Sequence, residues 1–332
     1  HPAIVTLLSE LVLEAVEKGY QTLEFALEVA MKRYPSDLKD KEWRILEPLI
    51  PQAQGQGRPR EYPWRELVNA MFYITRSARS WRMMPSDLPY WVTVYHYFRK
   101  WRKTGLWQKI NDILRERVRE ILGRNKQPSA GILDSQSIKT SEKGGVRGYD
   151  GAKKVKGRKR HLLVDTQGLV LKVVILPANI TDAEGGQKLL ENIKDTFTRL
   201  KHLFVDGGYK RTWCEWVEQT LGWSVEVVQR PDANFRGIWW PNDKPFPPEL
   251  EQELLKKTKG FRDFVVIPRR WVVERTFAWF TFYRRLNRDY DLLSETTETF
   301  IYTPMSRLML RRLASYTLFQ HPPTQLPAQQ TL

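Results

Sequence analysis

Cysteine is almost absent from this chain of 332 residues, which contains only Cys214. A single cysteine excludes a disulfide framework within the chain and a cysteine-rich zinc site, and it fits a reducing, cytoplasmic compartment. No apolar run approaches the roughly 18–20 residues that span a bilayer, so we expect no membrane-spanning segment. The phosphate-loop patterns GxxxxGK[ST] and GxGxxG are also missing, which argues against a nucleotide-driven machine.

Basic residues, in contrast, are in large excess. Lys and Arg number 54 against 38 Asp and Glu, so the formal net charge is +16. Hydrophobic residues make up 41% of the chain and include 13 Trp, which provides enough apolar surface for a packed core and excludes wholesale disorder. The basic residues alternate with aromatic ones instead of forming one basic amphipathic helix. This pattern favours nucleic acid over a membrane surface as the partner.

The amino-terminal part of the chain has two different compositions. Residues 1–30 are acidic, with apolar residues at near-helical spacing, and we expect an acidic helical extension there. Alternatively, Met31 is the natural start and these residues are upstream reading frame. Residues 31–125 are basic and aromatic, and they predict a helix after Asp37 or Asp40, a helix after Pro63 and a helix over 92–102.

The predicted helix over 92–102 follows a helix and a short break, which is the helix-turn-helix pattern. One of its faces carries basic and aromatic side chains. A solvated helical face is the alternative, but contact with double-stranded DNA is the better explanation of that composition. The candidate DNA-binding residues of this region are Tyr95, Arg99, Lys100 and Arg102.

From residue 130 onward, short apolar runs typical of strands alternate with helical patterns, so we expect an α/β layered domain. Two of these runs end in an acid, at Asp134 and at Asp206. The run ending in Asp165 is followed by Thr-Gln-Gly, which is an ordinary hairpin turn. The predicted strands and hairpin cover 131–133, 161–176, 203–205 and 225–228, and the predicted helices cover 182–193, 213–221 and 268 to about 290.

Carboxylates at strand ends can converge at one edge of a sheet. Glu274 is a third candidate, because it lies off the apolar stripe of the helix predicted after Pro268. Close carboxylates repel one another, so such a site either raises a pKa or binds a hard divalent cation. Without a His or Cys cluster, Mg²⁺ or Mn²⁺ is the expected occupant, and two such ions can cleave a phosphodiester. The alternatives are turn-forming Asp residues and a solvated Glu–Arg pair.

Several stretches of the chain resemble one family. GILDSQSIKT (131–140), LFVDGGY (203–209) and RRWVVERTFAWFTFYRRLNRDYD (269–291) look like the catalytic motifs of bacterial DDE insertion-sequence transposases of the insertion-sequence-five group, in the IS4-like superfamily. GRPREYPWRELVNAMFYI (57–74) and SWRMMPSDLPYWVTVYHYFRKWRKTG (80–105) resemble that group's amino-terminal region. The last helix departs from the signature Y-x2-R-x3-E-x6-K, since Ile267 and Thr281 occupy the Tyr and Lys positions, while Arg270 and Glu274 fit.

The resemblance implies a helical DNA-end-binding region at 31–125 and an RNase H-like catalytic domain at 126–315. Residues 232–260 look like an insertion, and 316–332 like a disordered tail. In such a domain Asp134, Asp206 and Glu274 bind Mg²⁺ or Mn²⁺ and drive strand cleavage and transfer at terminal inverted repeats. The implied partners are transposon-end and target DNA and a second copy of the chain, in a nucleoid-associated cytoplasmic protein. An inactive, transposase-derived repressor and a nuclease without strand transfer remain alternatives.

Further candidate DNA contacts lie near the acids. The segment 139–160 is rich in Lys and Arg, and so is the helix around Glu274; a solvated loop and Arg stems packed on Trp are the alternatives. Two adjacent Trp residues in the insertion are candidates for stacking on an unpaired base. The full set is Lys153, Lys154, Lys156, Arg158, Lys159, Arg160, Arg270, Arg284, Arg285, Trp239 and Trp240.

Overall fold

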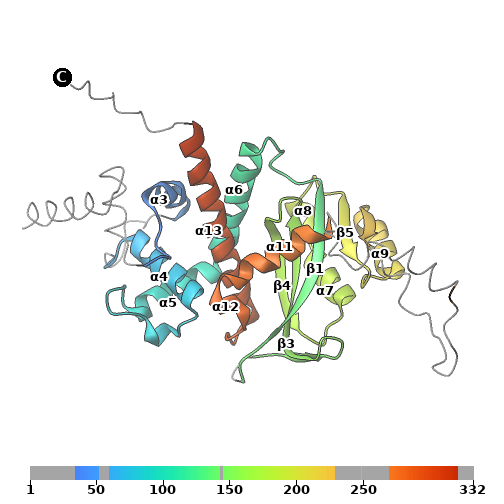
Figure 1. Ribbon diagram of the computed structural model, residues 1–332, viewed down its shortest axis with the longest axis horizontal. Helices are drawn as coiled ribbons and strands as arrows, with labels where there is room; N and C mark the ends of the chain where they lie inside the picture. Colours follow the sequence, from blue (N-terminus) through green and yellow to red (C-terminus); the bar gives the residue numbers. More distant parts are fainter. Residues whose placement is uncertain (1–33, 52–59, 143–144, 229–247, 249–268, 321–332) are drawn as a thin grey trace, which may run out of the picture. The chain divides into compact units, whose positions relative to one another are not determined.

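The computed structural model describes residues 34–51, 60–142, 145–228, 248 and 269–320, and these form two compact units (Figure 1). Along the described chain, no helix is long and apolar enough to cross a membrane. The acidic extension, most of the insertion with Trp239 and Trp240, and the tail beyond Gln320 lie outside the described residues. Of the tail expected at 316–332, only residues 316–320 are described, and they are helical, not disordered.

The first unit is helical and combines residues from both ends of the described chain. The predicted helices after Asp37, after Pro63 and over 92–102 are all present. Their bounds, with the carboxyl-terminal helices, are α3 Asp40–Leu46, η1 Glu47–Leu49, α4 Trp64–Ser77, η2 Trp81–Met83, α5 Trp91–Lys103, α6 Leu106–Ile121, α12 Arg284–Asn287 and α13 Ser294–Gln320.

Helix α13 belongs to this helical unit, which differs from the domain boundary expected at residue 315. Its Phe300 ring stacks on Phe98 of α5 with ring centroids 4.5 Å apart. Its buried Arg307 forms an ion pair with buried Glu42 of α3. Burial of these side chains among the amino-terminal helices attaches the end of the chain to them.

The second unit is the α/β domain that the sequence predicts, and its sheet has six strands. Strands β3, β1, β5 and β6 are neighbours in that order, and β2 and β4 both pair with the outer edge of β3. The β1–β3 and β3–β4 pairs are antiparallel, whereas β1–β5 and β5–β6 are parallel, as expected of an RNase H-like sheet. The strands are β1 Ala130–Lys139, β2 Gly148–Asp150, β3 Val155–Asp165, β4 Val170–Pro177, β5 His202–Asp206 and β6 Ser224–Val228.

Helices cover this sheet through its apolar side chains. Helices α7 (Asp182–Leu190), α8 (Ile193–Thr196) and α9 (Arg211–Leu221) share one hydrophobic cluster with Leu133 and Leu203. Side chains alternate along a strand, so Ile132 and Phe204 face the other way, and they line a pocket with residues of α11 (Arg270–Thr281). Helix α11 therefore lies against the opposite face from α7 and α9, and Figure 1 shows it crossing the sheet.

Two predicted elements of this region have different outcomes. The hairpin is confirmed: Oδ1 of Asp165 accepts hydrogen bonds from the amides of Gln167 and Leu169 across the β3–β4 turn. The helix predicted to continue to about Tyr290 is too long, since α11 ends at Thr281 and only the short α12 follows. Tyr283 is extended between them, which allows Arg285 to be buried against Asp291, so tertiary contacts override the helical pattern.

Candidate active site

Asp134 and Asp206 meet at the end of the parallel strand pair. Strands β1 and β5 are in register up to Ile132 and Phe204, and each Asp lies two residues further along its own chain. Because the side-chain period of a strand is two, both carboxylates project on the face that α11 covers. Both line one small pocket, together with Phe204, Arg270 and other side chains. The convergence predicted for these two acids is therefore present.

Asp206 lies at the end of its strand as predicted, but Asp134 does not. Asp206 is the last residue of β5, as predicted. Asp134, however, lies inside β1, which continues to Lys139 because β3 pairs with it along its whole length. Only the parallel pairing with β5 stops before Asp134. The end of the parallel ladder, not the end of the strand, therefore marks the position of this carboxylate.

The electrostatics of the pair are unfavourable when both carboxylates are charged. Burial, followed by the charge of Asp206, raises the pKa of Asp134 to about 7. The amide of Ser135, which donates to Asp134 Oδ1 at 2.7 Å, and the charges of Arg270 and Lys153 act in the opposite direction. Asp206 Oδ1 accepts a hydrogen bond from the amide of Gly208 at 2.9 Å.

Glu274 has a different environment. Its Oε1 lies 3.0 Å from Nη2 of Arg270, one helical turn earlier on α11, and its side chain is 43% exposed. Arg270, not Glu274, is the α11 residue that lines the pocket of the two Asp residues with Val273. In the described parts of the chain, no three acidic, His or Cys side chains are close enough together to hold a metal ion. A role for Glu274 as the third ligand therefore stays a prediction.

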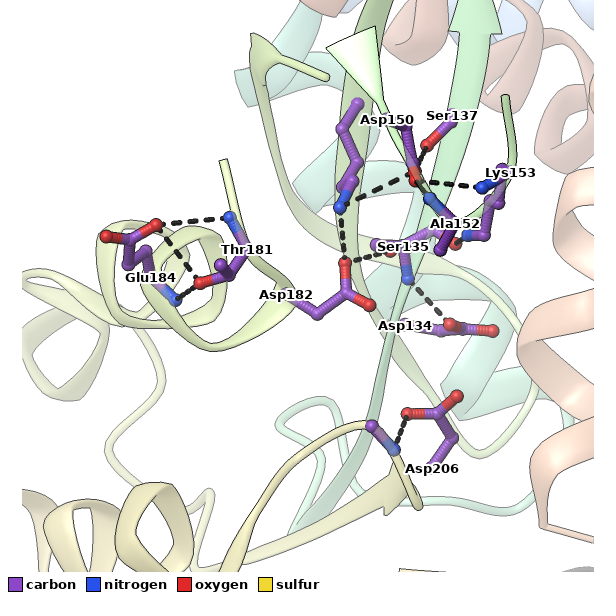
Figure 2. Close-up of polar contacts among 12 residues, drawn as sticks. Asp134, Ser135, Ser137, Asp150, Ala152, Lys153, Thr181, Asp182, Glu184 and Asp206 are labelled. Atoms are coloured by element: carbon purple, nitrogen blue, oxygen red, sulfur yellow. Dashed lines mark hydrogen bonds and ion pairs between the residues drawn. The ribbon is translucent and has the colours of Figure 1, made fainter. Parts of the chain in front are cut away.

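A polar network supports Asp134 from the other face of the sheet (Figure 2). Ser135 Oγ donates to Asp182 Oδ1 at 2.6 Å, and Lys159 Nζ lies 3.0 Å from the same oxygen. Lys159 also lies 3.7 Å from Asp150 Oδ2, which accepts a hydrogen bond from Ser137 Oγ at 2.5 Å. Since the Ser135 amide holds Asp134, this network connects the start of α7 to the candidate catalytic acid.

The donor set of the pocket fits a hard divalent cation. Asp134 and Asp206 each use Oδ1 to accept a backbone amide, and their Oδ2 atoms have no hydrogen-bond partner among the described residues. Carboxylate oxygens without nearby His or Cys are the ligands that Mg²⁺ and Mn²⁺ prefer. A bound cation would also relieve the repulsion that raises the pKa of Asp134.

The basic residues predicted to contact DNA divide into exposed and buried groups. Lys153, Lys154 and Lys156 are exposed. Arg158, Lys159 and Arg160 are buried on β3, so they do not fit the prediction of a phosphate contact. Lys159 is held by Asp150 and Asp182, Arg158 Nε donates to the Val146 carbonyl at 3.0 Å, and Arg160 Nη1 lies 3.4 Å from Gln136 Oε1.

The other predicted DNA contacts are divided in the same way. On α5, Tyr95, Arg99 and Lys100 are exposed, whereas Arg102 is half-buried and Nη1 donates to Thr296 Oγ1 at 2.6 Å. Arg284 is exposed. Arg285 is buried, with Nη2 2.8 Å from Asp291 Oδ1 and its guanidinium over the ring of Phe300, so it does not fit the prediction of a DNA contact.

Sequence reasoning missed Asp182, Ser135 and Tyr209 as neighbours of the site. Thr181 and Glu184 form a capping box at the start of α7. This S/T-x-x-E pattern predicts where the helix starts, but it gives no sign that Asp182 also contacts Ser135 and Lys159. The alternation of β1 would have placed Ser135 on the face opposite Asp134. The ion pair between Lys159 of β3 and Asp182 at the start of α7 depends on tertiary structure, which no local pattern predicts.

Two family models match the chain. The model described as "Transposase DDE domain" matches residues 125–302, just over half of the chain, and contains Asp134, Asp206 and Glu274. A second, described as "Putative transposase of IS4/5 family", matches residues 38–111. The chain therefore belongs to the DDE transposase family. It is a DNA transposase, of an enzyme class that cleaves and joins DNA strands with divalent metal ions.

Individual relatives are more distant. A protein of Burkholderia cepacia named "Insertion element IS402 uncharacterized 16.2 kDa protein" is 23% identical over 108 residues, which is 31% of this chain and 72% of that protein. Solved structures of the Mos1 strand transfer complex and of a Mos1 paired-end complex with the left transposon end are each 12% identical. They align over 85% and 84% of this chain and 97% of theirs, with TM-scores of 0.21 and 0.22, too low to indicate a shared whole-chain fold.

Proposed function

We propose that Asp134, Asp206 and Glu274 are the catalytic carboxylates of this transposase and bind two Mg²⁺ or Mn²⁺ ions. The observation that carries the proposal is the meeting of Asp134 and Asp206 at the end of the β1–β5 pair. Glu274 is one helical turn after Arg270, which lines the same pocket. For Glu274 to act as the third carboxylate, its exposed side chain must rotate away from Arg270 toward the two Asp residues.

The residues of the site have separate tasks in this proposal. Asp134 and Asp206 would hold the cations through Oδ2, while the amides of Ser135 and Gly208 fix their Oδ1 atoms. When bound, the ions supply activation of a water or 3′-hydroxyl and stabilisation of the leaving oxygen. Arg270 would offset the negative charge of the carboxylates, and its ion pair with Glu274 would break when Glu274 binds the cation. No side chain forms a covalent bond with DNA.

We propose further that α5 binds the terminal inverted repeats through exposed Arg99, Lys100 and Tyr95. Phosphate contacts from such a helix position a protein on the duplex. Exposed Lys153, Lys154 and Lys156 lie in the same unit as the carboxylates. They would contact the phosphates of the DNA strand that leads to the carboxylates. Since two transposon ends must be processed together, the active form would be a homodimer on DNA.

Incubation of the protein with Mg²⁺ and DNA that carries the flanking inverted repeats tests the proposal. Joined products are expected, and they must disappear in Asp134→Asn and Asp206→Asn while a gel shift remains. Free 3′-ends without joined products would instead indicate a nuclease without strand transfer. A gel shift without any cleavage would indicate a DNA-binding repressor derived from a transposase.

A further inference from the structure

The hydroxyl group of Tyr209 is buried without a hydrogen-bond partner. The residue is 2% exposed, and within the described part of the chain its hydroxyl contacts no donor or acceptor. The ring is held firmly, with its centroid 4.6 Å from that of Trp213, and it packs against Gly186 of α7. A buried hydroxyl without a partner costs free energy, which makes this group a candidate for a functional contact.

The surroundings of this hydroxyl are the carboxylates of the candidate site. Tyr209 belongs to the hydrophobic cluster under α7 and α9, so it approaches the end of β1 and β5 from the face opposite α11. Burial raises the pKa of Tyr209 well above its usual value, and the charges of Asp182, Asp134 and Asp206, in that order, raise it further. The charges of all three carboxylates therefore act on this hydroxyl.

Asp182 and Asp206 border the same small space. A side-chain carbon on Gly208 would lie 3.0 Å from Asp206 Oδ1 and 3.7 Å from Asp182 Oδ2. Asp182 Oδ1 is occupied by Ser135 and Lys159, but Oδ2 has no partner among the described residues. The Tyr209 hydroxyl and Asp182 Oδ2, both without a partner among the described residues, therefore belong to the same region, between the start of α7 and the end of β5.

The chemistry of the group defines its role. A phenol that is desolvated beside three negative charges keeps its proton, so it can donate a hydrogen bond but cannot act as a base. At 2% exposure it is also out of reach of a phosphodiester in the DNA backbone, which excludes a nucleophilic tyrosine at this position. The remaining role is that of a donor to a carboxylate.

We propose that Tyr209 is a positioning residue of the metal site, whose hydroxyl donates a hydrogen bond to the Asp182–Asp134–Asp206 carboxylate group when a divalent cation draws these side chains together. This inference rests on the proposed cation site of Asp134 and Asp206. The hydroxyl has no partner among the described residues. With a cation bound, it would donate to one of the carboxylate oxygens that the cation reorients.

The test compares Tyr209→Phe with the wild-type protein, without DNA, in two measurements. The thermal unfolding midpoint in EDTA is expected to stay the same or rise, because the variant loses a hydroxyl that has no partner. The Mn²⁺ dissociation constant, from titration of the electron paramagnetic resonance signal of free Mn²⁺, is expected to rise about tenfold, as for loss of one hydrogen bond to a charged group. Tyr302→Phe, at a buried tyrosine of the helical unit, is the control and should leave Mn²⁺ affinity unchanged.

Two results would overturn the inference. One is a Tyr209→Phe protein with Mn²⁺ affinity within twofold of wild type; the other is a lower unfolding midpoint in EDTA, which would show that the hydroxyl is already bonded in the empty protein. Asp206→Asn in the same titration distinguishes failure of the role of Tyr209 from failure of the cation site itself. If Asp206→Asn loses Mn²⁺ binding while Tyr209→Phe keeps it, only the role of Tyr209 fails. If Asp206→Asn binds Mn²⁺ as well as wild type, the cation site itself fails.

Discussion

Arg270 and Glu274 form an ion pair across one turn of α11, with Nη2 and Oε1 3.0 Å apart, beside the pocket that holds Asp134 and Asp206. The Arg270 side chain is 19% exposed and the Glu274 side chain 43% exposed, so the pair is partly screened by solvent and stabilises the fold by less than about 1 kcal/mol. Such a weak contact is easily exchanged. In the proposed site, a cation that binds Glu274 would therefore displace Arg270 at little cost.

A double-mutant cycle tests this exchange. Arg270→Met should raise the affinity for Mn²⁺ several-fold, because it removes a positive charge and frees Glu274. The gain should be smaller in a Glu274→Gln background, where no carboxylate is released. Calorimetric titration of the two single variants and the double variant measures the coupling. Strictly additive effects would show that Arg270 and the cation do not share Glu274.

The raised pKa of Asp134 predicts a pH-dependent stability. The pKa is 3.8 in a free aspartate and about 7 in the folded chain, so between these values the folded state holds a proton that the unfolded state has lost. The group therefore lowers the free energy of unfolding as pH rises through this window, and the loss is complete above pH 7. Without divalent cations, Asp134→Asn should gain stability over wild type between pH 4 and pH 8, by at most about 4 kcal/mol. Urea unfolding in EDTA checks this, and a difference that stays constant with pH would contradict it.

Lys159 is expected to stabilise the domain and not to bind DNA. Lys159→Met leaves buried Asp150 and partly buried Asp182 without their cation, which should cost roughly 2–5 kcal/mol in urea unfolding. The salt dependence of DNA binding by the folded variant should not change. Exposed Lys156 is the matched control, since Lys156→Met should leave stability intact and lower the salt slope by about one unit if it contacts phosphate. A reversed pattern would restore Lys159 as a DNA contact.

Helix α5 is expected to carry the end-binding surface. Arg99→Ala and Lys100→Ala each remove an exposed cation while the buried face formed by Val94, Phe98 and Trp101 stays intact. Each variant should weaken binding of inverted-repeat DNA and reduce the slope of log K against log salt by about one unit. Arg102→Ala should have a smaller effect on the slope, because that guanidinium is bonded to Thr296. Unchanged affinity and slope in all three variants would exclude α5 from the interface.

The sequence predicted the α/β class, the hairpin at Asp165 and the meeting of Asp134 with Asp206, because apolar runs and turn residues are local signals. It did not predict the burial of Arg158, Lys159 and Arg160. A run of basic residues is typical of a solvated loop, and only pairing of β3 on both sides places these side chains inside the domain. In the same way, residues of α13 pack on the amino-terminal helices through contacts that no local pattern contains.

Asp134, Asp206 and Glu274 are proposed to act together, and cleavage of transposon-end DNA by Glu274→Gln tests this most directly. Strand cleavage with Mg²⁺ and with Mn²⁺ should be measured beside a gel shift on the same DNA. Asp165→Asn is the control, since Asp165 belongs to a hairpin turn and the amide oxygen can still accept its hydrogen bonds. Glu274→Gln should bind the DNA but produce no nicks or joined strands, whereas Asp165→Asn should keep most activity. Cleavage by Glu274→Gln at the wild-type rate would contradict a catalytic role for Glu274.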